Sequence, residues 1–100
     1  MASVMAKIKV LQAVGAEELV DQALVKVMEF EIDRLQQEQR RLQTELVRFE
    51  QSYQMTSEEC QQKFDAGELG DAVEFFDWTS LYGIYQQNEY SLRLLEEKLV

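Results

Sequence analysis

Large apolar residues recur at alternating intervals of three and four between Val25 and Tyr53, and this repeat constrains the fold more than any other feature of the chain. A 3.5-residue repeat predicts a long helix whose apolar side chains form one seam along its length. Because a single helix cannot bury its own seam, the pattern predicts packing against another helix. The first seam consists of Val25, Met28, Ile32, Leu35, Gln39, Leu42, Leu46, Phe49 and Tyr53.

A second seam of the same spacing runs through the last third of the chain, in a helix long enough to fold back along the first. We therefore predict an all-α fold with a single helical domain over residues 16–100, in which the two long helices form a hairpin. We also expect a homodimer through the first seam, as a coiled coil or a four-helix bundle, with Gln39 fixing the register. The second seam consists of Trp78, Leu81, Tyr85, Asn88, Leu92, Leu95 and Leu99.

Capping signals divide the helical region into three helices. Thr56 and Glu59 have the spacing of a capping box, in which the hydroxyl accepts a hydrogen bond from the backbone three residues later. Asp71 and Glu74 repeat that spacing after a segment with two glycines in four residues, which allows the chain to reverse. The predicted helices cover about residues 16–54, 57–66 and 72–99.

The first fifteen residues form an N-terminal arm. Lysines alternate with Ile8 and Val10, which is the period-two pattern of a short β-strand, and Gly15 ends the run. A single strand needs a partner edge in a second copy or in another protein. The same stretch also fits a frayed tail.

Charge and composition narrow the function. The net charge is −9, and residues 56–100 contribute −7 of it, with three basic against ten acidic side chains. Because such a chain repels nucleic acid and anionic membranes, we expect a basic protein as the partner. The chain has no histidine and no phosphate-loop or zinc motif. We therefore expect a protein that is not an enzyme and needs no cofactor or metal.

Cys60 is the only cysteine, so no disulfide can form within the chain, and we expect a cytoplasmic location. We expect this thiol to pack as a small hydrophobic group. No apolar run approaches the roughly 18 residues that span a bilayer. Lysines interrupt the short apolar run near the N-terminus, so we do not expect a secretion signal.

Seven of the ten aromatic residues lie between Phe64 and Tyr90, among acidic residues. Phe75, Trp78 and Tyr82 fall in one stripe on a helix, the aromatic stripe. Aromatic residues inside a charged rim are typical of an interface hot spot and equally of an internal core. Phe76 lies off the stripe, so some aromatic surface should stay exposed. The candidate partner-binding residues are Glu68, Asp71, Glu74, Phe75, Asp77, Trp78 and Tyr82.

Residues 53–85 resemble a group of small bacterial and archaeal helical proteins. The shared pattern is Phe64 followed by the turn Gly67-Glu68-Leu69-Gly70-Asp71, and then Phe76-Asp77-Trp78 in the next helix. These proteins are similar to antitoxins encoded beside small ribonuclease toxins. The resemblance implies an antitoxin whose acidic, aromatic half covers the RNA-binding cleft of a basic toxin, while the long helix dimerises or clasps the toxin.

Two other classes of function fit parts of the sequence. A structural coiled-coil adaptor without a toxin partner would use all of its aromatic residues as internal core. A DNA-binding regulator would need a basic element, and only Lys7 and Lys9 on the N-terminal arm offer one. The leading prediction is therefore an antitoxin that inhibits by occlusion. An adjacent gene for a small basic protein would distinguish it from the adaptor.

Overall fold

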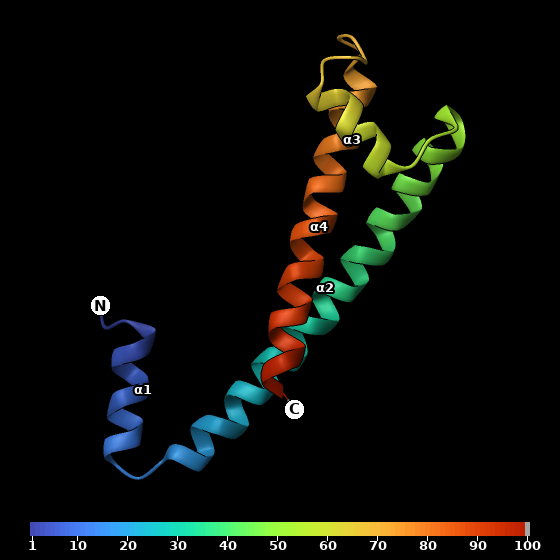
Figure 1. The fold of residues 1–100 in the computed structure, drawn as a ribbon. Coiled ribbons are helices and arrows are strands. Elements are labelled where there is room, and N and C mark those ends of the chain that lie inside the picture. The colour runs from blue at the N-terminus through green and yellow to red at the C-terminus, as the bar shows by residue number, and fades with distance from the viewer. Residues whose placement is uncertain (100) are drawn as a thin grey trace.

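The computed structural model describes residues 1–99, which form four helices and no strand. Figure 1 shows the third helix lying across the closed end of a hairpin made by the second and fourth. The predicted all-α hairpin is confirmed, and the three predicted helices differ from the observed ones by at most one residue at each end. The helices are α1 (Val4–Ala13), α2 (Glu17–Tyr53), α3 (Ser57–Asp65) and α4 (Val73–Leu99).

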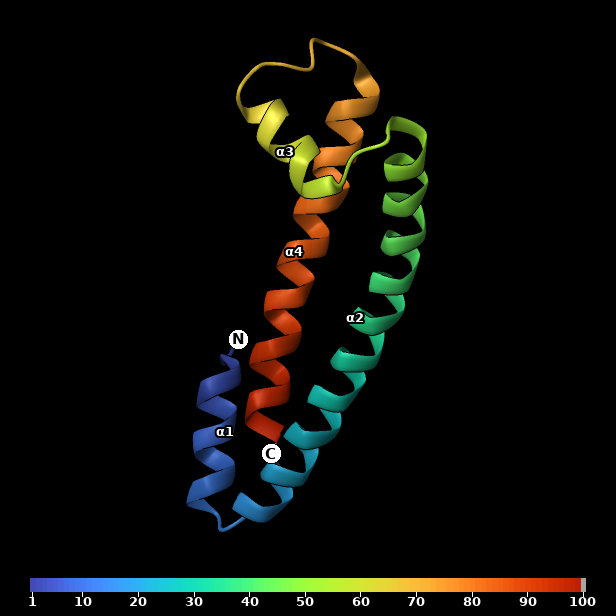
Figure 2. The same ribbon diagram turned by 45° about the vertical axis from the view of Figure 1, so that its right-hand side comes forward.

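The molecule is elongated, with extents of 60 × 25 × 20 Å and a radius of gyration of 19.6 Å. A compact domain of this length would have a radius of gyration of about 13 Å. The 37 residues of α2 explain the difference, because a helix of that length is about 55 Å long. The shorter α4 ends part of the way along α2, so α1 and the beginning of α2 project beyond the hairpin (Figures 1 and 2).

The two seams pack against each other within one chain. Leu35, Leu42 and Leu46 of α2 are buried, as are Trp78 and Leu92 of α4. The helices run antiparallel, so the hairpin itself satisfies the central part of the first seam. The hairpin thus provides a partner for these residues within one chain, and the dimer through the first seam stays a prediction. The residues of the first seam that the hairpin buries or half-buries are Leu35, Gln39, Leu42, Leu46 and Phe49. Nearer the N-terminus, the seam residues Val25, Met28 and Ile32 are half-buried.

The one polar residue of each seam reaches across to the opposite helix. Gln39 donates from Nε2 to the backbone carbonyl of Tyr85 and to Oε1 of Glu89, at 3.0 Å in both cases. Asn88 donates from Nδ2 to Oε1 of Glu38, also at 3.0 Å. Because a shift of either helix would leave these buried amides without partners, the pair fixes the register of the hairpin.

The N-terminal arm is a helix, so the prediction of a strand there is wrong. Ser3 caps α1 by accepting a hydrogen bond from the backbone N–H of Ala6 at 3.1 Å. Gly15 follows with a φ of 83°, and the N–H of Ala16 closes the helix end on the Leu11 carbonyl at 2.9 Å. The described chain contains no strand that could pair with this segment, whereas a helix satisfies its backbone groups internally.

Candidate protein-binding surface

Trp78 lies at the centre of the core at the closed end of the hairpin and is 0% exposed. Its indole Nε1 donates to Oγ of Ser57 at 2.9 Å, and its ring stacks on Phe49 with the ring centroids 5.4 Å apart. The prediction from the sequence that Trp78 belongs to a partner-binding face is therefore wrong. A side chain that the fold covers completely cannot contact a partner unless the fold opens.

Glu50 of α2 holds the start of α3 in place. One carboxylate oxygen, Oε2, accepts hydrogen bonds from the backbone N–H of Ser57 at 2.8 Å and from its hydroxyl at 2.9 Å. The carboxylate also sits at the positive end of the α3 dipole. Thr56 caps the same helix by accepting from the N–H of Glu59 at 3.1 Å, as the capping pattern predicts. Sequence reasoning missed Glu50, because it resembles the other charged residues of α2.

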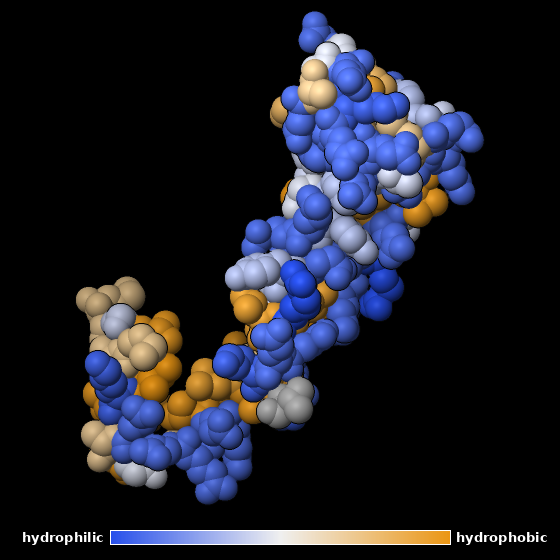
Figure 3. Space-filling view, in the orientation of Figure 1, coloured by the Kyte–Doolittle hydropathy of each residue, from blue (hydrophilic) through white to orange (hydrophobic). Residues whose placement is uncertain are grey.

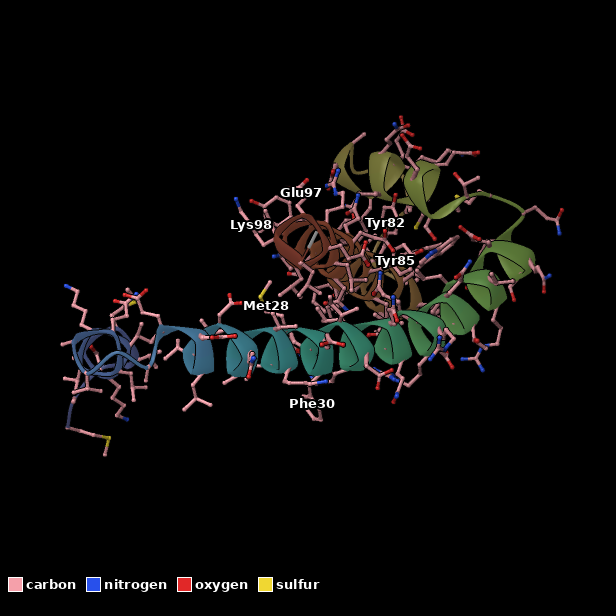
Figure 4. The ribbon with its side chains drawn as sticks, turned by 90° about the horizontal axis from the view of Figure 1, so that it is seen from below. Met28, Phe30, Tyr82, Tyr85, Glu97 and Lys98 are labelled. Atoms are coloured by element: carbon pink, nitrogen blue, oxygen red, sulfur yellow. The ribbon has the colours of Figure 1, made fainter. Side chains whose placement is uncertain are left out.

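The rest of the aromatic stripe also belongs largely to the core. Phe75 is half-buried and packs on Tyr53 with ring centroids 4.9 Å apart. Tyr82 is half-buried and packs against the same cluster. Figure 4 shows Tyr82 and Tyr85 on the side of α4 that faces α2. The stripe therefore forms the hairpin interface, and Phe75 and Tyr82 leave only part of their surface to a partner.

A different set of apolar side chains is exposed at this end of the molecule. Phe76 is 62% exposed and Val73 is 71% exposed, which confirms the prediction that Phe76 stays at the surface. They line a shallow groove between the end of α3 and the start of α4, together with Phe64 and Asp71. We call this region the acidic-aromatic surface, and it consists of Phe64, Glu68, Asp71, Val73, Glu74, Phe76 and Asp77.

Four carboxylates lie in the same stretch of chain as this groove, and one of them, Asp71, lines it. All four are exposed: Glu68, Asp71, Glu74 and Asp77. None of them forms an ion pair with a described residue, because the ion pairs there lie on α2 between Glu31 and Arg48. In the described part of the chain, no three Cys, Asp or Glu side chains lie close enough together to hold a metal ion. An exposed apolar patch in an acidic segment is suited to a protein surface with the opposite charge.

The sequence predicted that Asp71 caps α4, and this prediction is wrong. Asp71 is therefore available for this surface. The helix begins at Val73, and the N–H of Phe75 donates to the carbonyl of Ala72 at 3.1 Å. Ala72 therefore occupies the flanking position, one residue later than expected. Gly70 has a φ of 74° in the preceding turn, a conformation that favours glycine.

Sequence reasoning also missed Val73. Val73 and Phe76 are three residues apart on a helix, so they share a face, and that face lies opposite Trp78 of the second seam. Plotting all apolar residues of α4 around the helix would have separated the two faces. The aromatic stripe gives the stronger sequence signal because it contains more aromatic residues.

Cys60 is fully buried beside Trp78, and burial raises the pKa of its thiol. The unfolded chain, with a thiol pKa of about 8.5, therefore loses this proton at lower pH than the folded chain. It follows that the stability contributed by the neutral thiol is lost as the pH rises above that value.

We expect iodoacetamide to label Cys60 at pH 8 at least about a hundredfold more slowly in the folded chain than in denaturant, because only an exposed thiolate reacts. Mass spectrometry measures both rates, and equal rates would contradict the burial.

Comparison of the chain with protein-family models, with curated proteins and with solved structures yields no match. None of the described helices is long and apolar enough to cross a membrane.

Proposed function

We propose that this chain is a non-enzymatic protein-binding module, an antitoxin that neutralises a small basic nuclease toxin by covering its RNA-binding cleft. The acidic-aromatic surface would be the contact. The observation that carries the proposal is the exposure of Phe76 and Val73 in a segment whose four carboxylates, Glu68, Asp71, Glu74 and Asp77, are exposed as well.

The rigidity of the neighbouring core supports this role. Phe76 follows directly on Phe75 and precedes Trp78 by two residues, and these two neighbours are locked in the aromatic cluster. The exposed ring therefore projects from a helix whose position the core fixes. A side chain presented in this way loses little conformational freedom when it binds, which favours affinity.

The charge of the surface supports a basic partner. An RNA-binding cleft attracts phosphates with lysine and arginine side chains, so an acidic surface can occupy the same cleft and exclude the RNA. Complementary charge mainly accelerates association and depends on ionic strength. The affinity should therefore fall as salt is added, while the contact of Phe76 should be less sensitive to salt.

The test uses the product of the adjacent gene as the candidate toxin. We expect co-expression of this chain to restore growth to cells that produce the toxin, and Phe76→Glu to abolish the rescue. The charge would lie in a desolvated apolar contact, which costs roughly 3 kcal/mol or more and corresponds to at least a hundredfold weaker binding. Calorimetric titration of the two purified proteins measures that loss.

Val47→Glu is the matched control, because Val47 is also exposed, at 38%, and lies on α2 away from this surface. It should leave both rescue and affinity unchanged. If Phe76→Glu binds and rescues as well as the unchanged chain, the acidic-aromatic surface is not the contact. If no neighbouring product binds at all, the structural adaptor is the better assignment.

A further inference from the structure

Most of the exposed large hydrophobic side chains lie at the open end of the hairpin, away from the acidic-aromatic surface. Ten of the sixteen such residues in the described chain fall within residues 1–30. Figure 3 shows hydrophobic side chains gathered over α1 and the beginning of α2. We call this region the N-terminal apolar surface, and its main members are Val4, Met5, Leu11, Leu19, Val27 and Phe30.

Within one chain, α1 has few stabilising contacts. None of its residues is buried, and it contacts no helix other than α2. A helix of ten residues is marginal in water unless it buries an apolar face. A contact outside the chain would supply that burial.

The beginning of α2 carries two apolar faces, and the hairpin uses only one of them. Met28 points to the side on which α4 lies, whereas Phe30 points to the opposite side (Figure 4). Phe30 is 75% exposed. Leu19, Ala23 and Val27 precede it at intervals of four residues, and Phe30 follows Val27 by three. Both spacings place neighbours on one side of a helix. This second face is free for another partner.

We infer that the N-terminal apolar surface binds a second copy of this chain, with α1 of each copy packed against the beginning of α2 of the other. Charge complementarity between the two segments favours a second copy of this chain as the partner. The segment 1–16 carries Lys7 and Lys9 and no acidic residue, whereas the first turns of α2 carry Glu17, Glu18 and Asp21. Two-fold pairing brings these opposite charges together twice. Neither lysine forms an ion pair with a described residue of its own chain.

The available area is sufficient for a dimer. Nine large hydrophobic side chains between Val4 and Phe30 are exposed. Together they offer on the order of 1,000 Å², compared with the roughly 800 Å² that each partner contributes to a standard interface. A lipid surface fits less well, because Glu17, Glu18 and Asp21 lie beside the apolar residues and anionic lipid would repel them. This contact lies at the opposite end of the molecule from the proposed toxin contact and does not depend on it.

Sedimentation of the full chain tests the dimer. We expect a mass of about twice the 11.7 kDa of the chain. Phe30→Glu should raise the dissociation constant of the dimer at least about tenfold, because it places a charge in an apolar contact. Phe76→Glu is the control and should leave the dimer intact, and circular dichroism should show the same helix content in both variants.

A monomer at concentrations on the order of 100 µM, or a Phe30→Glu variant that dimerises normally, would overturn the inference. So would a chain that stays monomeric and floats with phosphatidylserine vesicles.

Charge exchange gives a sharper version of the same test. The variant Lys7→Glu with Lys9→Glu and the variant Glu17→Lys with Glu18→Lys should each dimerise more weakly, because like charges then meet across the interface. An equimolar mixture should restore the dimer, since each copy supplies the charge that the other needs. Failure of the mixture to associate would show that the charges act within one chain and would contradict the proposed pairing.

Discussion

Replacing Trp78 by alanine is expected to lower the free energy of unfolding by about 3–5 kcal/mol. The indole is completely buried, so its removal leaves a large cavity among rings that cannot close over it. It also removes the hydrogen bond to Ser57, through which α4 holds the start of α3. Chemical denaturation followed by circular dichroism measures the loss.

Phe76→Ala is the control for this experiment, because it removes an aromatic ring two residues away on the exposed side of the same helix. We expect it to change the free energy of unfolding by less than about 1 kcal/mol. Equal effects of the two substitutions, or a Trp78→Ala variant as stable as the unchanged chain, would mean that the closed end is not packed as described.

Leu42→Ala should lower the free energy of unfolding by about 2–5 kcal/mol. Leu42 is 1% exposed and lies in the middle of the first seam, where α4 covers it. Val47→Ala changes a residue of similar type on the exposed side of α2 and should cost less than about 1 kcal/mol. Thermal or chemical denaturation of both variants gives the comparison.

In the Phe30→Glu background, where the proposed N-terminal dimer is weakened, the loss caused by Leu42→Ala should be independent of protein concentration, because α2 and α4 belong to the same chain. If Leu42 instead faced a second copy, dilution would still lower the midpoint of unfolding in the Phe30→Glu background, and adding Leu42→Ala would increase the sensitivity to dilution. A stability loss that grows on dilution would therefore contradict packing of the two seams within one chain.

The helical part of the fold follows from features that are local in sequence. The seam spacing specifies which side of α2 and of α4 is apolar, and those sides meet in the structure. Thr56 marks the start of α3 because a threonine hydroxyl accepts from a backbone N–H at a fixed offset. The antiparallel hairpin within one chain follows less directly, because the same seams could also have paired between copies.

Other features depend on contacts between distant residues, which local patterns do not contain. The alternation around Ile8 resembles a strand, yet it forms a helix because no strand is available to pair with it. Trp78 and Phe76 belong to the same aromatic region, and only the packing of α2 and α3 decides that one is core and the other surface. Glu50 has no distinguishing pattern, because its partner Ser57 comes from another helix.

These observations divide the molecule by role. The aromatic stripe and the two seams maintain the hairpin, which leaves two exposed regions at opposite ends. The acidic-aromatic surface combines negative charge with Phe76, and the N-terminal apolar surface combines hydrophobic residues with charges of both signs. A substitution at one end should therefore leave the other function intact, as long as Trp78 and Leu42 keep the hairpin folded.

The most direct test of the proposed function is the light-scattering mass of the chain purified after co-expression with the product of its adjacent gene. We predict a complex that contains both proteins, that loses the neighbour when Phe76 is changed to Glu, and that keeps it when Val47 is changed to Glu. A mass that contains only this chain, with or without the neighbour present, would contradict the proposed function and favour a structural adaptor.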